Sequence, residues 1–267
     1  MTSAVLHETL APLRSNPSES AILLDIDGTL APIVDNAGDA TVPESTRQLI
    51  IAMSRRYGQL ACISGRRASE ARAMVSVGTI AYVGAHGGEL LRPGWTEAVV
   101  DPELLRWAPR VEAFRLESDT GELRRRRVRI EDKGTIIGYH WRGASDEADA
   151  RAAVDAIAAQ AKQAGLEVHW GRKVMEVRPP VRIDKGLAVR QVLGDRRYAA
   201  VLYVGDDTTD LDAFRAVRAL VQEGEVGQAI CVGVRSDDAP AGVAAEADLI
   251  VAGTDGVREL LAKLAAS

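Results

Sequence analysis

Short, strongly apolar runs alternate with helical patterns through much of this chain, and this alternation restricts the fold more than any other feature. The run AILLDID is typical of a buried strand, and the segment STRQLIIAMSRRYG that follows has a serine at its start, a glycine at its end and apolar residues at helical spacing. Strands that alternate with helices form a parallel sheet with helices on both faces. The strands are expected at residues 21–27, 59–64 and 198–207, and within 79–88, where a strand runs into a glycine turn.

The middle of the chain departs from this rhythm. Strand-like segments at 123–132, 135–143 and 168–179 accompany an alanine-rich helix at 146–165. This order favours a small antiparallel sheet with helices, inserted into an α/β fold whose core is a Rossmann-like parallel sheet. The expected boundaries are core residues 1–100, in which 1–20 are an N-terminal extension, an α+β insertion at 101–180, and core residues 181–267.

Composition and charge argue against several function classes. The net charge of −5 favours neither nucleic acid nor an anionic membrane as a partner. The first twenty residues lack the basic start and apolar stretch of a signal peptide, and no run approaches the ~20 apolar residues of a membrane span. Cys62 and Cys231 lie in apolar segments and are expected to be buried and reduced. We therefore expect a soluble, cytoplasmic protein.

Polar side chains follow the ends of the expected parallel strands, where ligands of such sheets bind. Carboxylates that lie close together repel one another unless a cation lies between them, and Mg²⁺ takes oxygen ligands, including those of a substrate phosphate. A lysine and a hydroxyl nearby would then hold a phosphoryl group. The strand ends carry Asp25, Asp27, Ser64, His86, Asp206 and Asp207, and Lys185 opens the helix after the insertion.

The pair Asp25 and Asp27 suits phosphoryl transfer. Asp25 can be a nucleophile that forms an aspartyl-phosphate, and Asp27, on the same strand face, can protonate the leaving oxygen and then accept a proton from water. Gly28 lets the chain turn and present N–H groups to phosphate. Taken alone, the pair also fits a turn in which aspartate caps the backbone. Ser64 alone also fits a helix start, and Arg66 fits either a substrate contact or a surface charge.

Together these motifs resemble those of the haloacid dehalogenase (HAD) superfamily and, within it, the trehalose-6-phosphate phosphatases. The resemblance covers nearly the whole chain from residue 21 on, and it implies a HAD core with a C2-type cap formed by the insertion. The matching motifs are D-x-D-G-T-L at 25–30, Ser64, Lys185 and G-D-D-x-T-D at 205–210, with APIV (31–34), SGR (64–66), GAHGGE (84–89), EDKG and GYHWR (131–142) and GRKVMEVRPP (171–180).

The resemblance also implies a role for each matching residue. Asp25 is the nucleophile and a Mg²⁺ ligand, and Asp27 is the acid and base, with its backbone carbonyl on the metal. Asp206 is the third metal ligand, and Asp207 and Asp210 support the metal site. Ser64 and Lys185 hold the transferring phosphoryl group. The substrate-binding residues implied are Gly28, Thr29, Arg66, His86, Glu131, Lys133, Arg142, Lys173 and Glu176.

The reaction expected from this resemblance is Mg²⁺-dependent hydrolysis of trehalose 6-phosphate to trehalose and phosphate, the last step of trehalose biosynthesis. We expect a monomer that can associate functionally with a trehalose-6-phosphate synthase. Three alternatives stay open: a phosphatase for another sugar phosphate, such as glucosyl- or mannosyl-phosphoglycerate, a phosphomutase, and a catalytically silent sugar-phosphate sensor. Mn²⁺ suits the same oxygen ligands as Mg²⁺.

Overall fold

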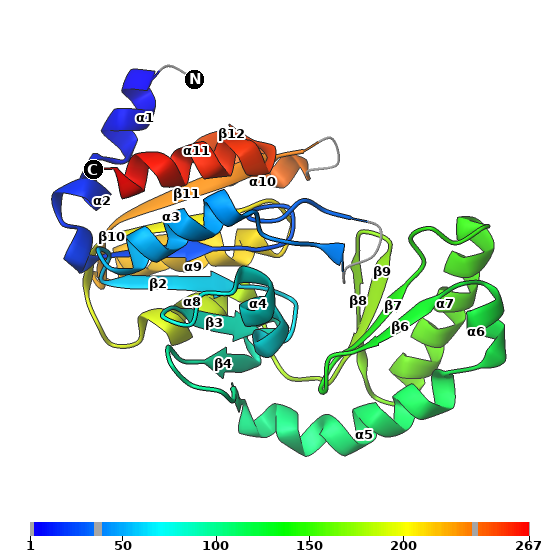
Figure 1. Ribbon diagram of the computed structural model, residues 1–267. Helices are drawn as coiled ribbons and strands as arrows, with labels where there is room; N and C mark the ends of the chain where they lie inside the picture. Colours follow the sequence, from blue (N-terminus) through cyan, green and yellow to red (C-terminus); the bar gives the residue numbers. More distant parts are fainter. Residues whose placement is uncertain (1–2, 35–38, 237–239, 267) are drawn as a thin grey trace. The chain divides into compact units, whose positions relative to one another are not determined.

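The computed structural model describes residues 3–34, 39–236 and 240–266 (Figure 1). The chain forms two compact units, which we call the core unit and the inserted unit. The core unit consists of Met1–Val99 and Ile183–Ser267, and the inserted unit consists of Val100–Arg182. No helix in these described stretches is long and apolar enough to cross a lipid bilayer.

An eight-stranded sheet runs through the core unit in the order β12-β11-β10-β1-β2-β3-β4-β5. Neighbours from β12 to β3 are parallel, and β4 is antiparallel to β3. Because β1 lies between β10 and β2, the residues that follow these three strands meet at one edge of the sheet. The strands are β1 Ser20–Leu24, β2 Gln59–Ile63, β3 Ala81–Gly84, β4 Glu89–Leu91, β5 Val99–Val100, β10 Tyr198–Gly205, β11 Val226–Arg235 and β12 Leu249–Ala252.

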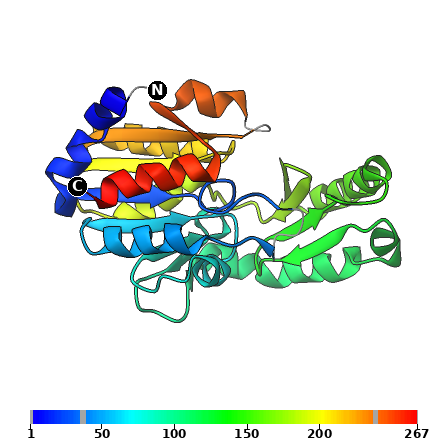
Figure 2. The ribbon, with the colours of Figure 1, turned by 45° about the horizontal axis from the view of Figure 1, so that its top comes forward.

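Helices bury both faces of this sheet, which explains why every residue of β1 is buried. Ile22 packs in the hydrophobic cluster that contains Ile50 and Leu261, and Leu23 packs in the opposite cluster with Phe214. In Figure 2, α3 and α11 lie side by side on one face. That face is covered by α3 (Glu44–Ser54), α4 (Ala68–Val75) and α11 (Gly253–Ala265), and the other by α8 (Lys185–Leu193), α9 (Asp210–Gln222) and α10 (Ala241–Glu246).

The described residues before β1 are mostly helical and dock on the core. They form α1 (Ser3–Thr9), α2 (Ala11–Ser15) and the 3₁₀ turn η1 (Pro17–Glu19). Leu10 and Leu13 are fully buried in the cluster that contains Ile22, so apolar contacts fix this segment to the sheet.

The inserted unit, drawn in green in Figure 1, has an antiparallel sheet in the order β6-β7-β9-β8. Its hydrophobic cluster joins Ile137 and Tyr139 of β7 to the helices, so the alternate residues Gly138 and His140 lie on the other face of the sheet. The elements are α5 (Pro102–Ser118), α6 (Gly121–Arg125), β6 (Arg129–Asp132), β7 (Ile137–His140), α7 (Glu147–Gln163), β8 (Glu167–Gly171) and β9 (Val174–Arg178).

Two of the strands expected here differ from the structure. The strand expected at 123–132 begins only at Arg129, since residues 123–125 belong to α6. Thr120 caps this helix through the Leu123 N–H, and Arg126 ties it to Asp149 of α7 at 2.7 Å. The segment 168–179 is not one strand but the hairpin of β8 and β9. The hairpin turns at Lys173, whose φ of 56° lies in the left-handed region.

Candidate active site

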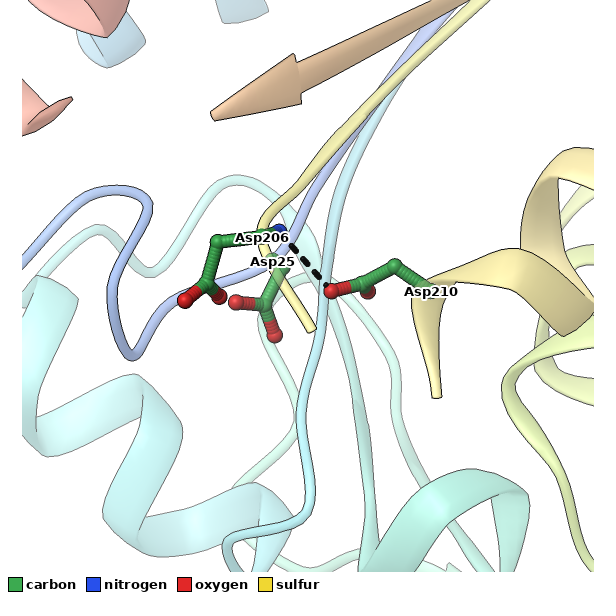
Figure 3. Close-up of side chains that lie close together, drawn as sticks. All are labelled: Asp25, Asp206 and Asp210. Atoms are coloured by element: carbon green, nitrogen blue, oxygen red, sulfur yellow. Dashed lines mark hydrogen bonds between the residues drawn. The ribbon is translucent and has the colours of Figure 1, made fainter. Parts of the chain in front are cut away.

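Three buried carboxylates meet where β1 and β10 end (Figure 3). Asp25 continues the β1–β10 ladder through its N–H, which donates to the Val204 carbonyl at 2.9 Å, and Asp206 follows the last residue of β10. One carboxylate oxygen from each of Asp25, Asp206 and Asp210 lies within 4.8 Å of the other two, and the three residues are 4%, 2% and 0% exposed. The sequence predicted Asp25 and Asp206 at this edge of the sheet, and the family resemblance implied Asp210 as support for the metal site.

Lys185 is the cation that faces these carboxylates. Its Nζ lies 2.6 Å from Asp25 Oδ1 and 2.6 Å from Asp210 Oδ1. Burial acts to lower the pKa of Lys185, but the two carboxylates outweigh it and raise this pKa, so the lysine is cationic. The Asp184 side chain accepts the Leu187 N–H at 2.7 Å and so caps the helix that Lys185 begins.

One ammonium does not balance three carboxylates. Burial raises the pKa of Asp25 well above its usual value, and Asp210 and Asp206 raise it further, although Lys185 opposes them. A divalent cation would relieve this repulsion, and oxygen-only donors at short range are the set that Mg²⁺ takes. The cluster therefore fits a metal ion.

Asp210 already uses both of its oxygens. Its Oδ1 accepts from Lys185 Nζ at 2.6 Å and from the Tyr203 hydroxyl at 2.7 Å. Its Oδ2 accepts from the N–H groups of Asp206 at 3.0 Å and of Asp207 at 2.9 Å. A carboxylate with four donors is held in place and has little left to offer a metal. The geometry therefore favours Asp25 and Asp206 as side-chain ligands, with Asp210 fixing the turn that carries Asp206.

The loop after β1 packs tightly against Asp206. Gly28 has a φ of +84°, and a Cβ at this position would lie 2.2 Å from Asp206 Oδ2. The Gly28 N–H donates to the Ala31 carbonyl at 2.8 Å, and the Thr29 N–H donates to the Ile26 carbonyl at 3.2 Å. Because these N–H groups are used inside the loop, the structure gives Gly28 a steric role beside Asp206.

At the end of β2, Ser64 and Arg66 begin the loop that leads into α4. The Ser64 hydroxyl, 1% exposed, accepts the Arg66 N–H at 3.1 Å. The Arg66 guanidinium binds both oxygens of Asp27, with Nε to Oδ2 at 2.7 Å and Nη2 to Oδ1 at 2.6 Å. Asp27 therefore has a side-chain partner of its own and does not join the Asp25, Asp206 and Asp210 cluster.

The turn after β3 supports this loop. Ala85 and His86 have φ angles of 49° and 55°, which non-glycine residues rarely adopt. The His86 N–H donates to the Ser64 carbonyl at 3.2 Å, and its imidazole lies so close to Gly65 that a Cβ there would be 2.6 Å from Nε2. The structure thus places the predicted substrate contact His86 directly behind the Ser64 loop.

Glu89 is a residue of this site that the sequence analysis missed. It is 4% exposed, and its Oε2 accepts the Ala68 N–H at 2.8 Å at the start of α4. Because Arg67 provides no side-chain cap, Glu89 supplies the missing acceptor from β4. In the sequence, the only sign of this capping role was the position of an acid at the end of the GAHGGE motif.

The inserted unit holds a second group of charged side chains, on the sheet face away from its helices. Lys133 Nζ lies 2.8 Å from Glu176 Oε1, and Arg178 Nε lies 3.0 Å from Glu176 Oε2. His140 Nε2 lies 2.7 Å from Glu131 Oε2. We call these five residues the inserted-unit cluster. It brings together the predicted substrate contacts Glu131, Lys133 and Glu176.

Gly138 leaves room for part of this cluster. A Cβ there would lie 2.9 Å from His140 Nε2 and 3.3 Å from Glu131 Oε2. Burial acts to raise the pKa of Glu131, but His140 and Lys133 outweigh it and lower this pKa to about 2. His140, which the sequence analysis did not include among the site residues, is thus part of the cluster; the signal was its place two residues from Gly138 on β7.

Two other predicted contacts have different partners. Lys173 Nζ lies 2.8 Å from Glu147 Oε2, and Arg142 Nη2 donates to the Arg172 carbonyl at 3.4 Å. Lys173 lies in the β8–β9 turn, three residues before Glu176, and Arg142, which follows β7, reaches this turn through its hydrogen bond to Arg172. The structure therefore divides the predicted contacts of the inserted unit into two groups.

Comparisons with known proteins agree with this geometry. The family model described as trehalose-phosphatase matches residues 23–242. A trehalose-phosphate phosphatase of Mycobacterium marinum is 35% identical over 243 residues, which cover 84% of this chain and 59% of that protein, so the chain spans about three fifths of that relative.

Two solved structures share the fold. The C-terminal domain of trehalose-6-phosphate phosphatase from C. albicans has a TM-score of 0.78 at 22% identity, covering 98% of this chain and 97% of that one. A haloacid dehalogenase-like hydrolase from Bacteroides thetaiotaomicron has a TM-score of 0.62 at 17% identity, covering 92% of this chain and 99% of that one. These likenesses confirm the predicted α/β fold with its parallel-sheet core.

Proposed function

The chain belongs to the trehalose-phosphatase family, and we propose that it is a phosphoric monoester hydrolase that converts trehalose 6-phosphate to trehalose and phosphate. The observation that carries this proposal is the buried group of Asp25, Asp206 and Asp210, with the ammonium of Lys185 2.6 Å from both Asp25 and Asp210. The activity named for the Mycobacterium marinum relative supports the choice of substrate. This reaction is the last step of trehalose biosynthesis.

The first step that we propose is phosphoryl transfer to Asp25. A carboxylate oxygen of Asp25 attacks phosphorus, the bond from phosphorus to the sugar oxygen breaks, and that oxygen takes a proton from the Asp27 carboxyl group. In the second step water attacks the aspartyl-phosphate, Asp27 takes a proton from this water, and the bond to Asp25 breaks to release phosphate. The proton that Asp27 gives in the first step is thus recovered in the second.

The remaining core residues bind charge. Lys185, at the start of α8 and 2.6 Å from Asp25 Oδ1, supplies a fixed positive charge for the phosphoryl oxygens, and Ser64, buried at the end of β2, supplies a hydroxyl. Asp25, Asp206 and the backbone carbonyl of Asp27 are the groups that we propose to hold Mg²⁺. The bound ion supplies positive charge to the phosphoryl group and offsets the neighbouring carboxylates.

We propose that the inserted unit is the cap and that its residues contact the sugar. A network of acids and bases offers both donors and acceptors to sugar hydroxyls, and a poor substrate would leave these groups unpaired. Glu131, Lys133 and Glu176 are the contacts best supported, because they meet on one sheet face. Arg142 and Lys173, the cytoplasmic location, the monomeric state and the association with a synthase stay predictions of the sequence.

The test is phosphate release with Mg²⁺ from a panel of sugar phosphates. The panel holds trehalose 6-phosphate, sucrose 6-phosphate, glucose 6-phosphate, and glucosyl- and mannosyl-3-phosphoglycerate. We expect a strong preference for trehalose 6-phosphate and loss of activity on addition of EDTA. Preferred release from another member would contradict the sugar assignment, and sugar-phosphate isomerisation without phosphate release would contradict hydrolysis.

A further inference from the structure

The forked ion pair between Arg66 and Asp27 is a contact that the proposed reaction does not yet use. Two hydrogen bonds, at 2.7 and 2.6 Å, join the guanidinium to both carboxylate oxygens. This geometry fixes the plane of a carboxylate, which a single hydrogen bond cannot do. Asp27 is the more exposed partner, with 39% of its side chain accessible against 14% for Arg66. A half-exposed aspartate would otherwise rotate among several rotamers.

The backbone of Arg66 is itself fixed. Its N–H donates to the Ser64 hydroxyl at 3.1 Å, and its carbonyl accepts the Ala85 N–H at 2.7 Å. Glu89 holds the start of the helix that follows, through the Ala68 N–H at 2.8 Å. The guanidinium thus projects from a loop that is tied down on both sides.

We propose that Arg66 is a positioning residue that orients the Asp27 carboxyl group for proton transfer to the leaving oxygen. The inference rests on the proposed phosphatase function, and it gives Arg66 a role other than the substrate contact or surface charge considered from the sequence. Misorientation of a general acid slows the step in which the leaving oxygen departs. It slows this step most for a basic leaving group, which needs its proton as the bond to phosphorus breaks.

The experiment compares two aryl phosphates that differ in how much their leaving oxygen needs a proton from the general acid. Phenyl phosphate has a basic leaving oxygen, whereas 4-nitrophenyl phosphate releases a weakly basic one that departs without help. The rate of phenol release in the first turnover reports bond breaking, and it is measured for wild type, R66K, R66Q, D27N and the R66K/D27N double variant. Lysine keeps the positive charge of Arg66 but cannot make its two parallel hydrogen bonds to one carboxylate.

We expect R66K and R66Q to lower the rate with phenyl phosphate by about 10- to 100-fold, within the range that a general acid contributes. With 4-nitrophenyl phosphate we expect a loss of less than about threefold, since this substrate bypasses the acid. Activity retained on 4-nitrophenyl phosphate also shows that a variant is folded. The double variant should be no slower than D27N, because Arg66 acts through Asp27.

The matched control is R190K. Arg190 makes the same kind of forked pair, with Glu223 at 2.6 and 2.8 Å, between α8 and α9. Its replacement should leave the ratio of the two rates unchanged. If R66K lowered the rates with both aryl phosphates equally, or only raised their KM, Arg66 would be a phosphate contact and the inference would be wrong. A double variant with additive losses would also overturn it.

Failure of the proposed function gives a different result. Wild-type protein that hydrolyses the aryl phosphates but not trehalose 6-phosphate would contradict the sugar assignment, and the Arg66 comparison would still decide its own question. Wild-type protein that hydrolyses no phosphate monoester would overturn both proposals.

Discussion

The charged cluster of the core unit and that of the inserted unit are built in opposite ways. In the core, three carboxylates face one ammonium, and burial raises the pKa of Asp25. In the inserted unit, Glu131 and Glu176 face Lys133 and Arg178, with His140 as a further partner. Among the contacts named above, the first group has an excess of negative charge that an added cation would offset, whereas the second is balanced by its own members.

This difference teaches what each cluster is suited to bind. Buried like charges are costly unless a ligand of the other sign is present, so the core group favours a metal and the phosphoryl group that comes with it. A balanced network leaves oriented donors and acceptors without net charge, which suits neutral hydroxyl groups. Substitutions that remove, displace or unbalance these charges test the comparison.

The largest effect is expected from Asp25→Asn. This change removes the proposed nucleophile, so phosphate release should fall to background, by at least about 10³-fold. Burial raises the pKa of Asp25, so its stabilising contribution is present at low pH and is lost as the pH rises through that pKa. The variant should therefore melt at the same or a higher temperature than wild type in EDTA at pH 7.

Calorimetry with and without Mg²⁺ checks the second half of this prediction. Mg²⁺ should raise the melting temperature of wild type more than that of the variant, because the ion relieves repulsion that asparagine has already removed. Turnover of a few per cent of wild type would contradict the nucleophile assignment. An equal response of both proteins to Mg²⁺ would contradict the place of Asp25 at the metal.

The second largest effect is expected from Gly28→Ala, on the Mg²⁺ dependence of activity. The added Cβ would lie 2.2 Å from Asp206 Oδ2, so Asp206 must move. We expect the Mg²⁺ concentration for half-maximal activity to rise about 10- to 100-fold, as when a group that orients a metal ligand is lost.

Gly94→Ala is the matched control for this substitution. Gly94 has nearly the same backbone conformation, with a φ of +78°, but nothing lies within 4 Å of an added Cβ. The Gly94→Ala variant therefore measures only the cost of placing alanine in the left-handed backbone conformation, about 1–2 kcal/mol in unfolding free energy. A similar loss of Mg²⁺ response in both variants would show that backbone strain, and not Asp206, is responsible.

The convergence of the core site could be predicted from the sequence because it follows from the sheet. Parallel strands place their carboxyl ends at one edge, so Asp25, Asp206 and Ser64 needed only the alternation of strands and helices to be located. In the inserted unit, the alternation on β9 placed Glu176 and Arg178 on one face.

The partners of these side chains could not be predicted in the same way. The Arg66–Asp27 pair joins residues 39 positions apart, and the Glu89 cap reaches 21 positions back to α4. Such contacts depend on how loops fold against one another, which periodicity does not encode. The helix at 121–125 was missed for a related reason, because Thr120 and the contact of Arg126 with Asp149 outweigh the alternation that favoured a strand.

In the inserted unit, Glu176→Gln should unbalance the cluster. Lys133 and Arg178 would lose the carboxylate that both contact, and a broken buried pair costs about 3–5 kcal/mol. We expect a lower melting temperature and a roughly tenfold higher KM for trehalose 6-phosphate, with the rate on 4-nitrophenyl phosphate unchanged, since that substrate has no sugar.

The exposed pair of Arg115 and Glu112 provides the control, because Glu112→Gln removes a surface contact worth at most about 1 kcal/mol. Equal effects of Glu176→Gln on the two substrates would place Glu176 outside sugar binding.

The smallest effect is expected from Glu131→Gln, and it depends on pH. His140 and Lys133 lower the pKa of Glu131 to about 2 against the opposing effect of burial. A carboxylate whose pKa is depressed in the folded state stabilises that state above its unfolded pKa of roughly 4.3, and this stability is lost as the pH falls towards 2. Wild type should therefore unfold at a higher urea concentration than Glu131→Gln at pH 7, and the gap should narrow steadily between about pH 5 and pH 2. Glu167→Gln is the control, because Glu167 also pairs with a histidine, His169, at 3.3 Å on β8 at the other edge of this sheet, but both side chains are about half exposed to water. A gap that stayed constant over this pH range would show that Glu131 stabilises the unit by packing and not by charge, and the inserted-unit cluster would then no longer differ from the core site in the way that its contacts indicate.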